Sequence, residues 1–113
     1  RHPRNSGYHA VFEMRSGALA TSGDYECFLV HEGVRYSHLI DPFTGYSGTG
    51  TQSATVFAET CGRADAYATA AAVGGREAVQ GFDMRGVIGI MLLTEDENGE
   101  VSPWSTGVLP NSR

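Results

Sequence analysis

The chain has 113 residues, 41% of them apolar and 15 of them Gly, which suits one globular domain and excludes two ordinary domains or a disordered chain. Its 8 cationic and 13 acidic residues give a formal net charge of −5. Because nucleic-acid-binding domains usually carry a basic face, we expect no nucleic-acid partner. No apolar run approaches the ~18 residues of a membrane-spanning helix.

The first half of the chain predicts two β-hairpins. The first has arms at 9–14 and 18–22, joined by a turn at Ser16-Gly17. The second has arms at 27–31 and 34–40, joined by a turn at Glu32-Gly33. Gly-containing pairs between apolar, β-branched and aromatic runs are typical of antiparallel hairpins. A turn at Ser22-Gly23-Asp24 separates the two hairpins. Residues 41–51 then predict a long functional loop, because Pro and several Gly residues interrupt any strand there.

The second half predicts one principal helix between strands. A strand at 53–58 precedes a helix at 61–73, where Ala is dense, with Thr60 as its N-cap and Gly74-Gly75 as its stop. The remaining elements are a short helix at 76–80, a strand at 87–94 and a strand at 101–105 beyond a turn at Asn98-Gly99. The whole predicts an α+β fold of antiparallel strands and hairpins packed with one main helix.

Residues 37–45, Ser-His-Leu-Ile-Asp-Pro-Phe-Thr-Gly, are the first candidate site. His38 and Asp41 bracket the end of a predicted strand, where Pro42 cannot donate a further ladder hydrogen bond and Gly45 permits a tight turn. A strand end that enters a Gly-rich loop commonly presents an imidazole and a carboxylate to a ligand. The alternative is that His38 is a half-buried strand residue and Asp41 caps an Asp-Pro turn.

Asp65 and Thr69 are the second candidate site, on the predicted main helix. Because they stand at positions i and i+4, the carboxylate and the hydroxyl share one helix face about one turn apart. Two oxygen ligands at this spacing suit Mg²⁺, which takes one or two protein carboxylates together with phosphates and water. The alternative is that Asp65 stabilises the helix N-terminus through the macrodipole and Thr69 packs its methyl group.

Thr21, Ser22 and Gly23 are the third candidate site. Hydroxyls and backbone N–H groups around a Gly turn can hold phosphate oxygens. The same residues also describe an ordinary junction between a strand and a turn, and by themselves they favour that interpretation.

Cys27 and Cys61 do not define a site by their spacing. They are far apart in the sequence and lack the spacing of metal ligands. A disulfide, two buried thiols or one reactive thiol all remain open.

Three motifs follow one another in a fixed order along the chain. They are Ala-Thr-Ser-Gly-Asp-Tyr at 20–25, Tyr-Ser-His-Leu-Ile-Asp-Pro-Phe-Thr-Gly-Tyr at 36–46 and Ala-Asp-Ala-Tyr-Ala-Thr-Ala at 64–70. This order resembles the ApbE family, the FAD:protein FMN transferases, also called flavin transferases and formerly thiamine-biosynthesis lipoproteins. The resemblance implies that residues 1–113 are the C-terminal part of an ApbE-like flavin transferase domain. Since the chain begins at Arg1 rather than Met, we expect a processed product or a piece of a longer protein.

The resemblance also assigns residues to roles. Asp65 and Thr69 match the family's Mg²⁺ ligands, which hold the metal against the FAD pyrophosphate, and His38 matches its active-site histidine. The residues implied to bind the flavin nucleotide are Thr21, Ser22, Gly23, His38, Asp41, Thr44 and Gly45. The family motif usually has Arg where Phe43 stands and Pro where Ser47 stands, so a charge-assisted contact to the pyrophosphate is lost here.

The activity implied by the resemblance is Mg²⁺-dependent transfer of FMN from FAD to a Thr or Ser hydroxyl of an acceptor flavoprotein, with release of AMP. His38 is the implied catalytic base. The alternative is a non-catalytic or incomplete flavin-nucleotide-binding remnant, or an FAD pyrophosphatase. The family's N-terminal portion supplies much of the FAD cleft and is missing here, which implies that this fragment alone is inactive. The family further implies a bacterial periplasmic protein or a membrane-anchored lipoprotein.

Overall fold

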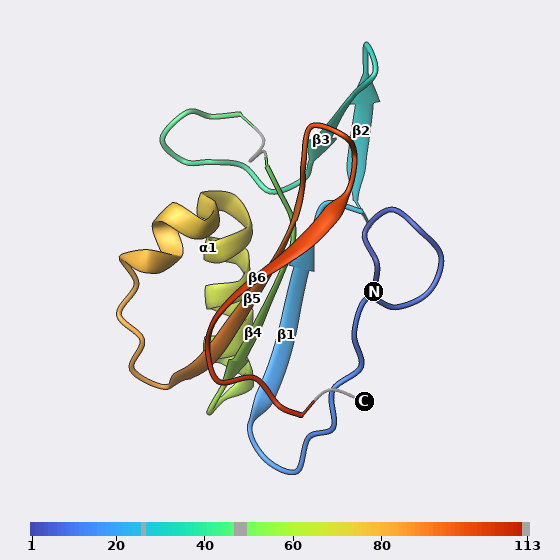
Figure 1. The fold of residues 1–113 in the computed structure, drawn as a ribbon. Helices are drawn as coiled ribbons and strands as arrows, with labels where there is room; N and C mark the ends of the chain where they lie inside the picture. Colours follow the sequence, from blue (N-terminus) through green and yellow to red (C-terminus); the bar gives the residue numbers. More distant parts are fainter. Residues whose placement is uncertain (26, 47–49, 112–113) are drawn as a thin grey trace.

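A four-stranded antiparallel sheet organises the structure, which is a computed structural model describing residues 1–25, 27–46 and 50–111 (Figure 1). Within these residues the elements are β1 (Ala18–Gly23), β2 (Phe28–His31), β3 (Val34–Ser37), β4 (Thr51–Ala58), α1 (Cys61–Gln80), β5 (Val87–Glu95) and β6 (Val101–Gly107). The main sheet has the order β1-β4-β5-β6, and β2 pairs with β3 in a separate two-stranded sheet. The expected α+β fold with one main helix is therefore confirmed.

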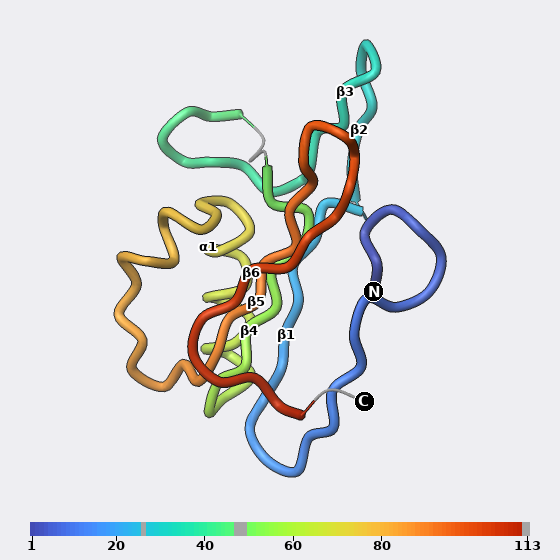
Figure 2. Tube along the Cα trace, in the orientation of Figure 1, coloured from blue at the N-terminus to red at the C-terminus, as the bar shows by residue number. Residues whose placement is uncertain are grey.

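The core lies between α1 and one face of the main sheet. Its buried side chains come from β4, β5 and α1 and include Ala54, Val56, Ala58, Ala64, Ala68, Ala71, Val79, Ile90 and Leu92. Most of the helix residues among them are Ala, so the helix axis can lie close to the sheet while the interior stays densely packed. The Cα trace in Figure 2 shows α1 running along β4 for much of the strand's length.

Replacing Ile90 by Ala is expected to destabilise the protein by about 2–5 kcal/mol, because it removes buried methyl groups and leaves a cavity. Ile90 is fully buried in the centre of β5. Urea denaturation followed by circular dichroism measures the loss. Ile40→Ala is the matched control, because that side chain is 52% exposed. Equal losses for the two variants would contradict this placement of the core.

The main helix begins and bends where its residues predict. Thr60 caps it, since the Thr60 hydroxyl accepts a hydrogen bond from the Arg63 backbone N–H at 3.3 Å. The expected stop at Gly74-Gly75 is a kink, with Gly75 at φ 68° and ψ −164°, and the short helix expected at 76–80 continues α1 beyond it. Buried Val79 packs this last part on the core. No helix in the described residues combines the length and apolar content needed to cross a membrane.

The expected first hairpin is wrong. Residues 9–14 form no strand, and β1 instead pairs antiparallel with β4, with Ala18 opposite Ala58 and Gly23 opposite Ser53. The long, buried strand β4 offers β1 a complete ladder, whereas residues 9–14 are held elsewhere, by a hydrogen bond from the Glu13 N–H to the Asn111 carbonyl at 2.9 Å.

The turn expected at Ser22-Gly23-Asp24 begins later than predicted, because Ser22 and Gly23 still belong to β1. Asp24 follows the strand and accepts two hydrogen bonds from the Arg4 guanidinium, at 2.8 and 2.9 Å. These bonds raise the pKa of Arg4 above its ordinary value. The pair ties the start of the chain to the end of β1.

The two other hairpins are present with altered bounds. Glu32 and Gly33 form the β2–β3 turn with φ values of 51° and 76°, as a tight hairpin turn requires. Strand β3 ends at Ser37 instead of continuing to residue 40. One further backbone hydrogen bond joins the His38 N–H to the Cys27 carbonyl at 3.2 Å, and the Leu39 N–H then donates to the Ser37 hydroxyl at 3.1 Å. The β5–β6 turn contains Asn98-Gly99 as predicted, inside a longer connection closed by Asp96, and β6 continues to Gly107.

Candidate active site

The exposed face of α1 carries the predicted metal ligands. Ala64 and Ala68 are fully buried against the sheet, which turns Asp65 and Thr69 outward on the solvent side of the helix. The i and i+4 spacing places their oxygens about one helical turn apart. This arrangement leaves both groups accessible to a ligand.

The end of β1 lies beside this helix face. The Ser22 and Thr69 hydroxyl oxygens are 3.2 Å apart, within hydrogen-bond distance. Because side chains alternate along a strand, Thr21 points to the other face of the sheet, where its hydroxyl oxygen lies 2.8 Å from that of Thr55. The structure thus places Ser22 beside Thr69 on α1, whereas Thr21 lies away from Asp65 and Thr69.

The loop after β3 is closed by its own backbone. The Asp41 carboxylate accepts a hydrogen bond from the Phe43 N–H at 2.9 Å, and the Asp41 carbonyl accepts one from Gly45 at 2.8 Å. The Thr44 hydroxyl accepts from the Tyr46 N–H at 3.2 Å, and Gly45 has φ 74°. Asp41 and Thr44 therefore shape the loop, as the structural alternative for Asp41 predicts. The Ser47 and Gly48 positions lie outside the described residues.

His38 lies where the β2–β3 hairpin meets this loop. Its side chain is exposed, and its ring Nδ1 is 3.1 Å from the Cys27 carbonyl oxygen. Its backbone N–H donates to the same oxygen at 3.2 Å. The Cys27 carbonyl is not among the predicted site residues, although the paired arms of the predicted hairpin place residues 27 and 38 opposite one another.

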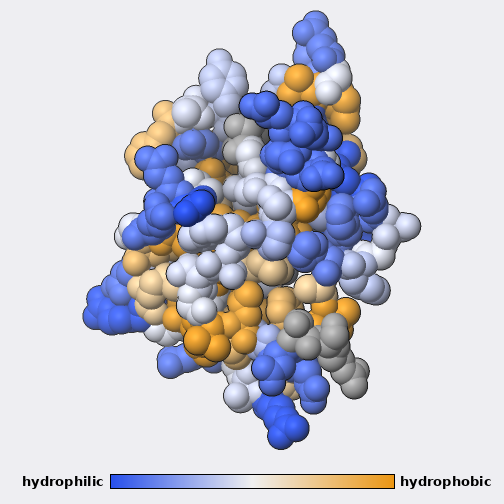
Figure 3. Space-filling view, viewed as in Figure 1, coloured by the Kyte–Doolittle hydropathy of each residue, from blue (hydrophilic) through white to orange (hydrophobic). Residues whose placement is uncertain are grey.

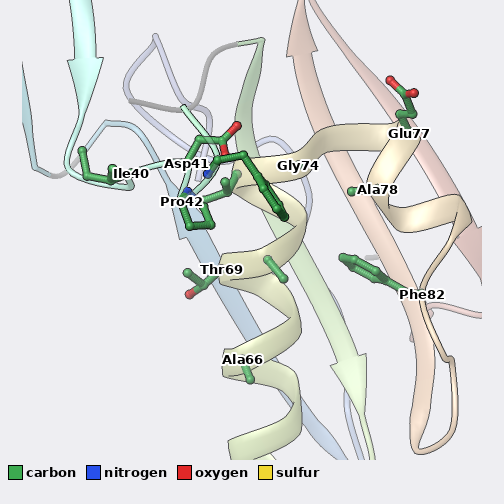
Figure 4. A pocket seen from close by; sticks show the side chains of 12 residues that line it. Ile40, Asp41, Pro42, Ala66, Thr69, Gly74, Glu77, Ala78 and Phe82 are labelled. Atoms are coloured by element: carbon green, nitrogen blue, oxygen red, sulfur yellow. The ribbon is translucent and has the colours of Figure 1, made fainter. Parts of the chain in front are cut away.

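A cavity of about 800 Å³ joins the loop to the helix (Figure 4). Its lining includes Asp41 and Thr69, which come from two different candidate sites, together with Glu77 at the kinked end of α1. The other lining side chains are mainly apolar, among them Ile40, Pro42, Phe43, Val73 and Phe82. In Figure 4, Asp41 and Pro42 lie above Thr69, and Phe82 lies on the other side of the helix, below Ala78. His38, Thr44, Gly45 and Asp65 do not line this cavity.

The donor set on α1 fits a metal that is shared with a phosphate ligand. In the described ranges, no three His, Cys, Asp or Glu side chains gather into a metal-binding group. Asp65 supplies a single carboxylate, and Thr69 and Ser22 supply neighbouring hydroxyl oxygens. Mg²⁺ commonly binds through one or two carboxylates, with phosphate and water oxygens completing its octahedron. Asp65 and Thr69 can therefore hold Mg²⁺ only together with such a ligand.

The two cysteines are free and exposed. A disulfide between Cys27 and Cys61 and a pair of buried thiols, which the sequence left open, are both excluded in this structure.

Comparison with known proteins identifies the family. The ApbE family model matches residues 1–87. The chain is 36% identical over 90 residues to the FAD:protein FMN transferase of Vibrio cholerae, covering 79% of this chain and 27% of that protein. It is 42% identical over 80 residues to the FAD:protein FMN transferase of Treponema pallidum, covering 68% of this chain and 22% of that protein.

A solved relative has the same fold over most of this chain. The ApbE protein from Thermotoga maritima superposes with a TM-score of 0.73 at 38% identity, covering 90% of this chain and 33% of the Thermotoga chain. The chain thus spans between 22% and 33% of the length of these relatives. The family match over residues 1–87 and this shared fold together establish that the chain belongs to the ApbE family.

Proposed function

We propose that this chain carries part of the active site of a Mg²⁺-dependent FAD:protein FMN transferase, which moves FMN from FAD to a Thr or Ser hydroxyl of an acceptor flavoprotein. The chain belongs to the ApbE family, and one observation in it carries the proposal. Thr69, which forms the oxygen pair on α1 with Asp65, lies beside Ser22 of β1 and lines the same cavity as Asp41. The curated relatives are named for this activity, which supports the same reaction class here.

The helix and the end of β1 hold the pyrophosphate end of FAD in this proposal. Asp65 and Thr69 bind Mg²⁺ through oxygen atoms, and Ser22 offers a further hydroxyl beside Thr69. When bound, Mg²⁺ supplies neutralisation of the negative charge that develops as the phosphoanhydride breaks. A cation suits this position, because Asp41 and Glu77, the titratable groups among the described residues that line the adjacent cavity, are both acidic and would repel a pyrophosphate.

His38 acts as the general base. The acceptor hydroxyl oxygen attacks the phosphorus of the FMN portion, a new P–O bond forms, and the P–O bond to the bridging oxygen breaks. AMP leaves with the bridging oxygen, and the hydroxyl proton passes to the Nε2 atom of His38. Imidazole suits this role because it changes charge near neutral pH. The exposed ring leaves space for the acceptor polypeptide to approach.

The test is to complete this chain with the N-terminal portion that its relatives have, to incubate the completed protein with FAD and Mg²⁺, with and without an acceptor flavoprotein, and to quantify AMP by chromatography. The expected result is AMP formation that depends on both the acceptor and Mg²⁺ and that stops on adding a chelator. AMP formed equally without the acceptor would instead indicate an FAD pyrophosphatase. Binding of FAD with no AMP would indicate a non-catalytic remnant.

Replacing Phe43 by Arg is expected to tighten FAD binding about tenfold, because a guanidinium at the cavity mouth adds a charge-assisted hydrogen bond to phosphate. Phe43 lines the cavity and is 98% exposed, so the change costs little stability. Flavin fluorescence quenching measures the affinity. Tyr46→Arg is the control, since Tyr46 is 76% exposed in the same loop but does not line the cavity. Equal gains in both variants would contradict a local contact.

A further inference from the structure

The β2–β3 hairpin stands apart from the main sheet. It extends beyond the other strands in Figure 1, and its two strands pack chiefly on each other. All four residues of β2 are exposed, and orange apolar residues are visible on this part of the surface in Figure 3. A two-stranded hairpin is only marginally stable in water. The hairpin therefore adds little to the packing of the core. Its base, where it joins the candidate site, is the part that can contribute to function.

A backbone carbonyl at the base of the hairpin determines which ring nitrogen of His38 carries the hydrogen. The Cys27 carbonyl oxygen accepts the His38 backbone N–H at 3.2 Å and lies 3.1 Å from ring Nδ1. A carbonyl oxygen has two lone pairs and can only accept hydrogen bonds, so Nδ1 must carry the hydrogen in this contact. In the neutral ring, Nε2 is then left with the lone pair that a base requires.

The Glu32-Gly33 turn sets the register of the hairpin, and this register places the Cys27 carbonyl opposite His38. Glu32 and Gly33 both have positive φ values, and the register runs from His31 opposite Val34 to Phe28 opposite Ser37. The next pair in that register is Cys27 and His38. A slip of one residue would turn alternate side chains to the other face of the hairpin and would end the contact between the Cys27 carbonyl and the His38 ring.

A side-chain contact near the base reinforces this register. The Arg35 guanidinium lies over the Phe28 ring, 3.9 Å from its centroid. Such a cation–π contact bridges the two strands next to the Cys27–His38 pair. The hairpin thus holds His38 by its backbone and its ring from one side.

We propose that the β2–β3 hairpin is the positioning element for His38 and that the Cys27 carbonyl is its orienting group. The carbonyl selects the Nδ1–H tautomer and aims Nε2 toward the acceptor hydroxyl. The catalytic consequence rests on the proposed function, whereas the tautomer is a property of this chain by itself. Cys27 and Gly33 are positioning residues and do not contact the reacting atoms.

Long-range ¹H–¹⁵N NMR of the ¹⁵N-histidine-labelled protein, at a pH where His38 is neutral, tests the proposal directly. The expected spectrum has a protonated-type nitrogen at Nδ1 of His38 and an unprotonated-type nitrogen at Nε2. His31 is the internal reference, because its exposed ring lies at the other end of the same hairpin, 3.9 Å from the Glu32 carboxylate. A neutral His38 that carries its hydrogen on Nε2 would overturn the proposal without any variant.

Gly33→Val and Gly99→Val form a matched pair of variants. Gly33 and Gly99 have φ values of 76° and 80° in different hairpin turns, and both conformations are strained for Val. Gly33→Val is expected to shift His38 toward the Nε2–H tautomer and to lower kcat for FMN transfer about 10- to 100-fold, with FAD affinity unchanged. Gly99→Val is expected to leave the His38 spectrum as in the wild type.

Thermal unfolding of both variants shows whether the main sheet remains folded. A folded Gly33→Val protein with an unchanged His38 tautomer would overturn the role of the hairpin. The two proposals fail separately. The expected tautomer with no acceptor-dependent AMP release would refute only the proposed function, and FMN transfer by a protein with the opposite tautomer would refute only the positioning role.

Discussion

Replacing Asp65 by Ala is expected to weaken Mg²⁺-dependent FAD binding by on the order of 100-fold. Loss of a residue that only orients a metal ligand costs about 10- to 100-fold in affinity, so loss of a ligand itself should reach at least the top of that range. Asp65 is the carboxylate of the oxygen group on α1, and neither Thr69 nor Ser22 can supply a negative charge in its place. Titration of Mg²⁺ against FAD fluorescence, at fixed protein concentration, measures the effect. FAD binding in the presence of a chelator should be equally weak in the variant and the wild type.

Glu97→Ala is the control for this prediction. Glu97 is an exposed acid in the connection between β5 and β6, and its removal changes the net charge by the same amount as the Asp65 variant. It should leave the Mg²⁺ dependence unchanged. If both variants respond equally, the effect comes from overall charge and Asp65 is not a metal ligand.

Replacing His38 by Ala is expected to reduce FMN transfer about 10²- to 10⁴-fold, the usual contribution of a general base. The loss should appear mainly in kcat. FAD binding should weaken far less, because Asp65 and Thr69 remain in place even though His38 is also implied to contact the flavin nucleotide. Acceptor-dependent AMP release at saturating FAD measures it.

His31→Ala is the matched control, since His31 is an exposed imidazole at the tip of the same hairpin. Its removal should leave transfer unchanged. An equal loss in both variants would assign the effect to the hairpin surface, and an undiminished rate in His38→Ala would remove His38 from the reaction.

Local signals in the sequence predicted the elements that depend on short-range contacts. Thr60 caps α1, the Gly74-Gly75 pair bends it, and the Glu32-Gly33 turn joins β2 and β3, each because neighbouring residues satisfy the backbone. The pairing of β1 with β4 could not be predicted in this way. It depends on which distant strand offers β1 the better ladder, and an apolar run at 9–14 looks equally suitable when only the sequence is considered.

The same limit applies to the site. The i and i+4 spacing correctly placed Asp65 and Thr69 on one exposed helix face. The strand alternation that separates Thr21 from Ser22 follows from β1 continuing through Gly23, where a turn was predicted. The cavity is lined by residues far apart in the sequence, from Ile40 before the loop to Phe82 beyond the kinked end of α1, and no local pattern predicts that they meet.

The most direct test of FMN transfer is the intact mass of an acceptor flavoprotein after incubation with FAD, Mg²⁺ and this chain completed with the N-terminal portion that its relatives have. The account predicts that the acceptor gains the mass of one FMN group on a Thr or Ser, with one AMP released for each group transferred. The gain should be absent with a chelator and with Asp65→Ala. An acceptor of unchanged mass, in a mixture where FAD is demonstrably bound, would contradict the account.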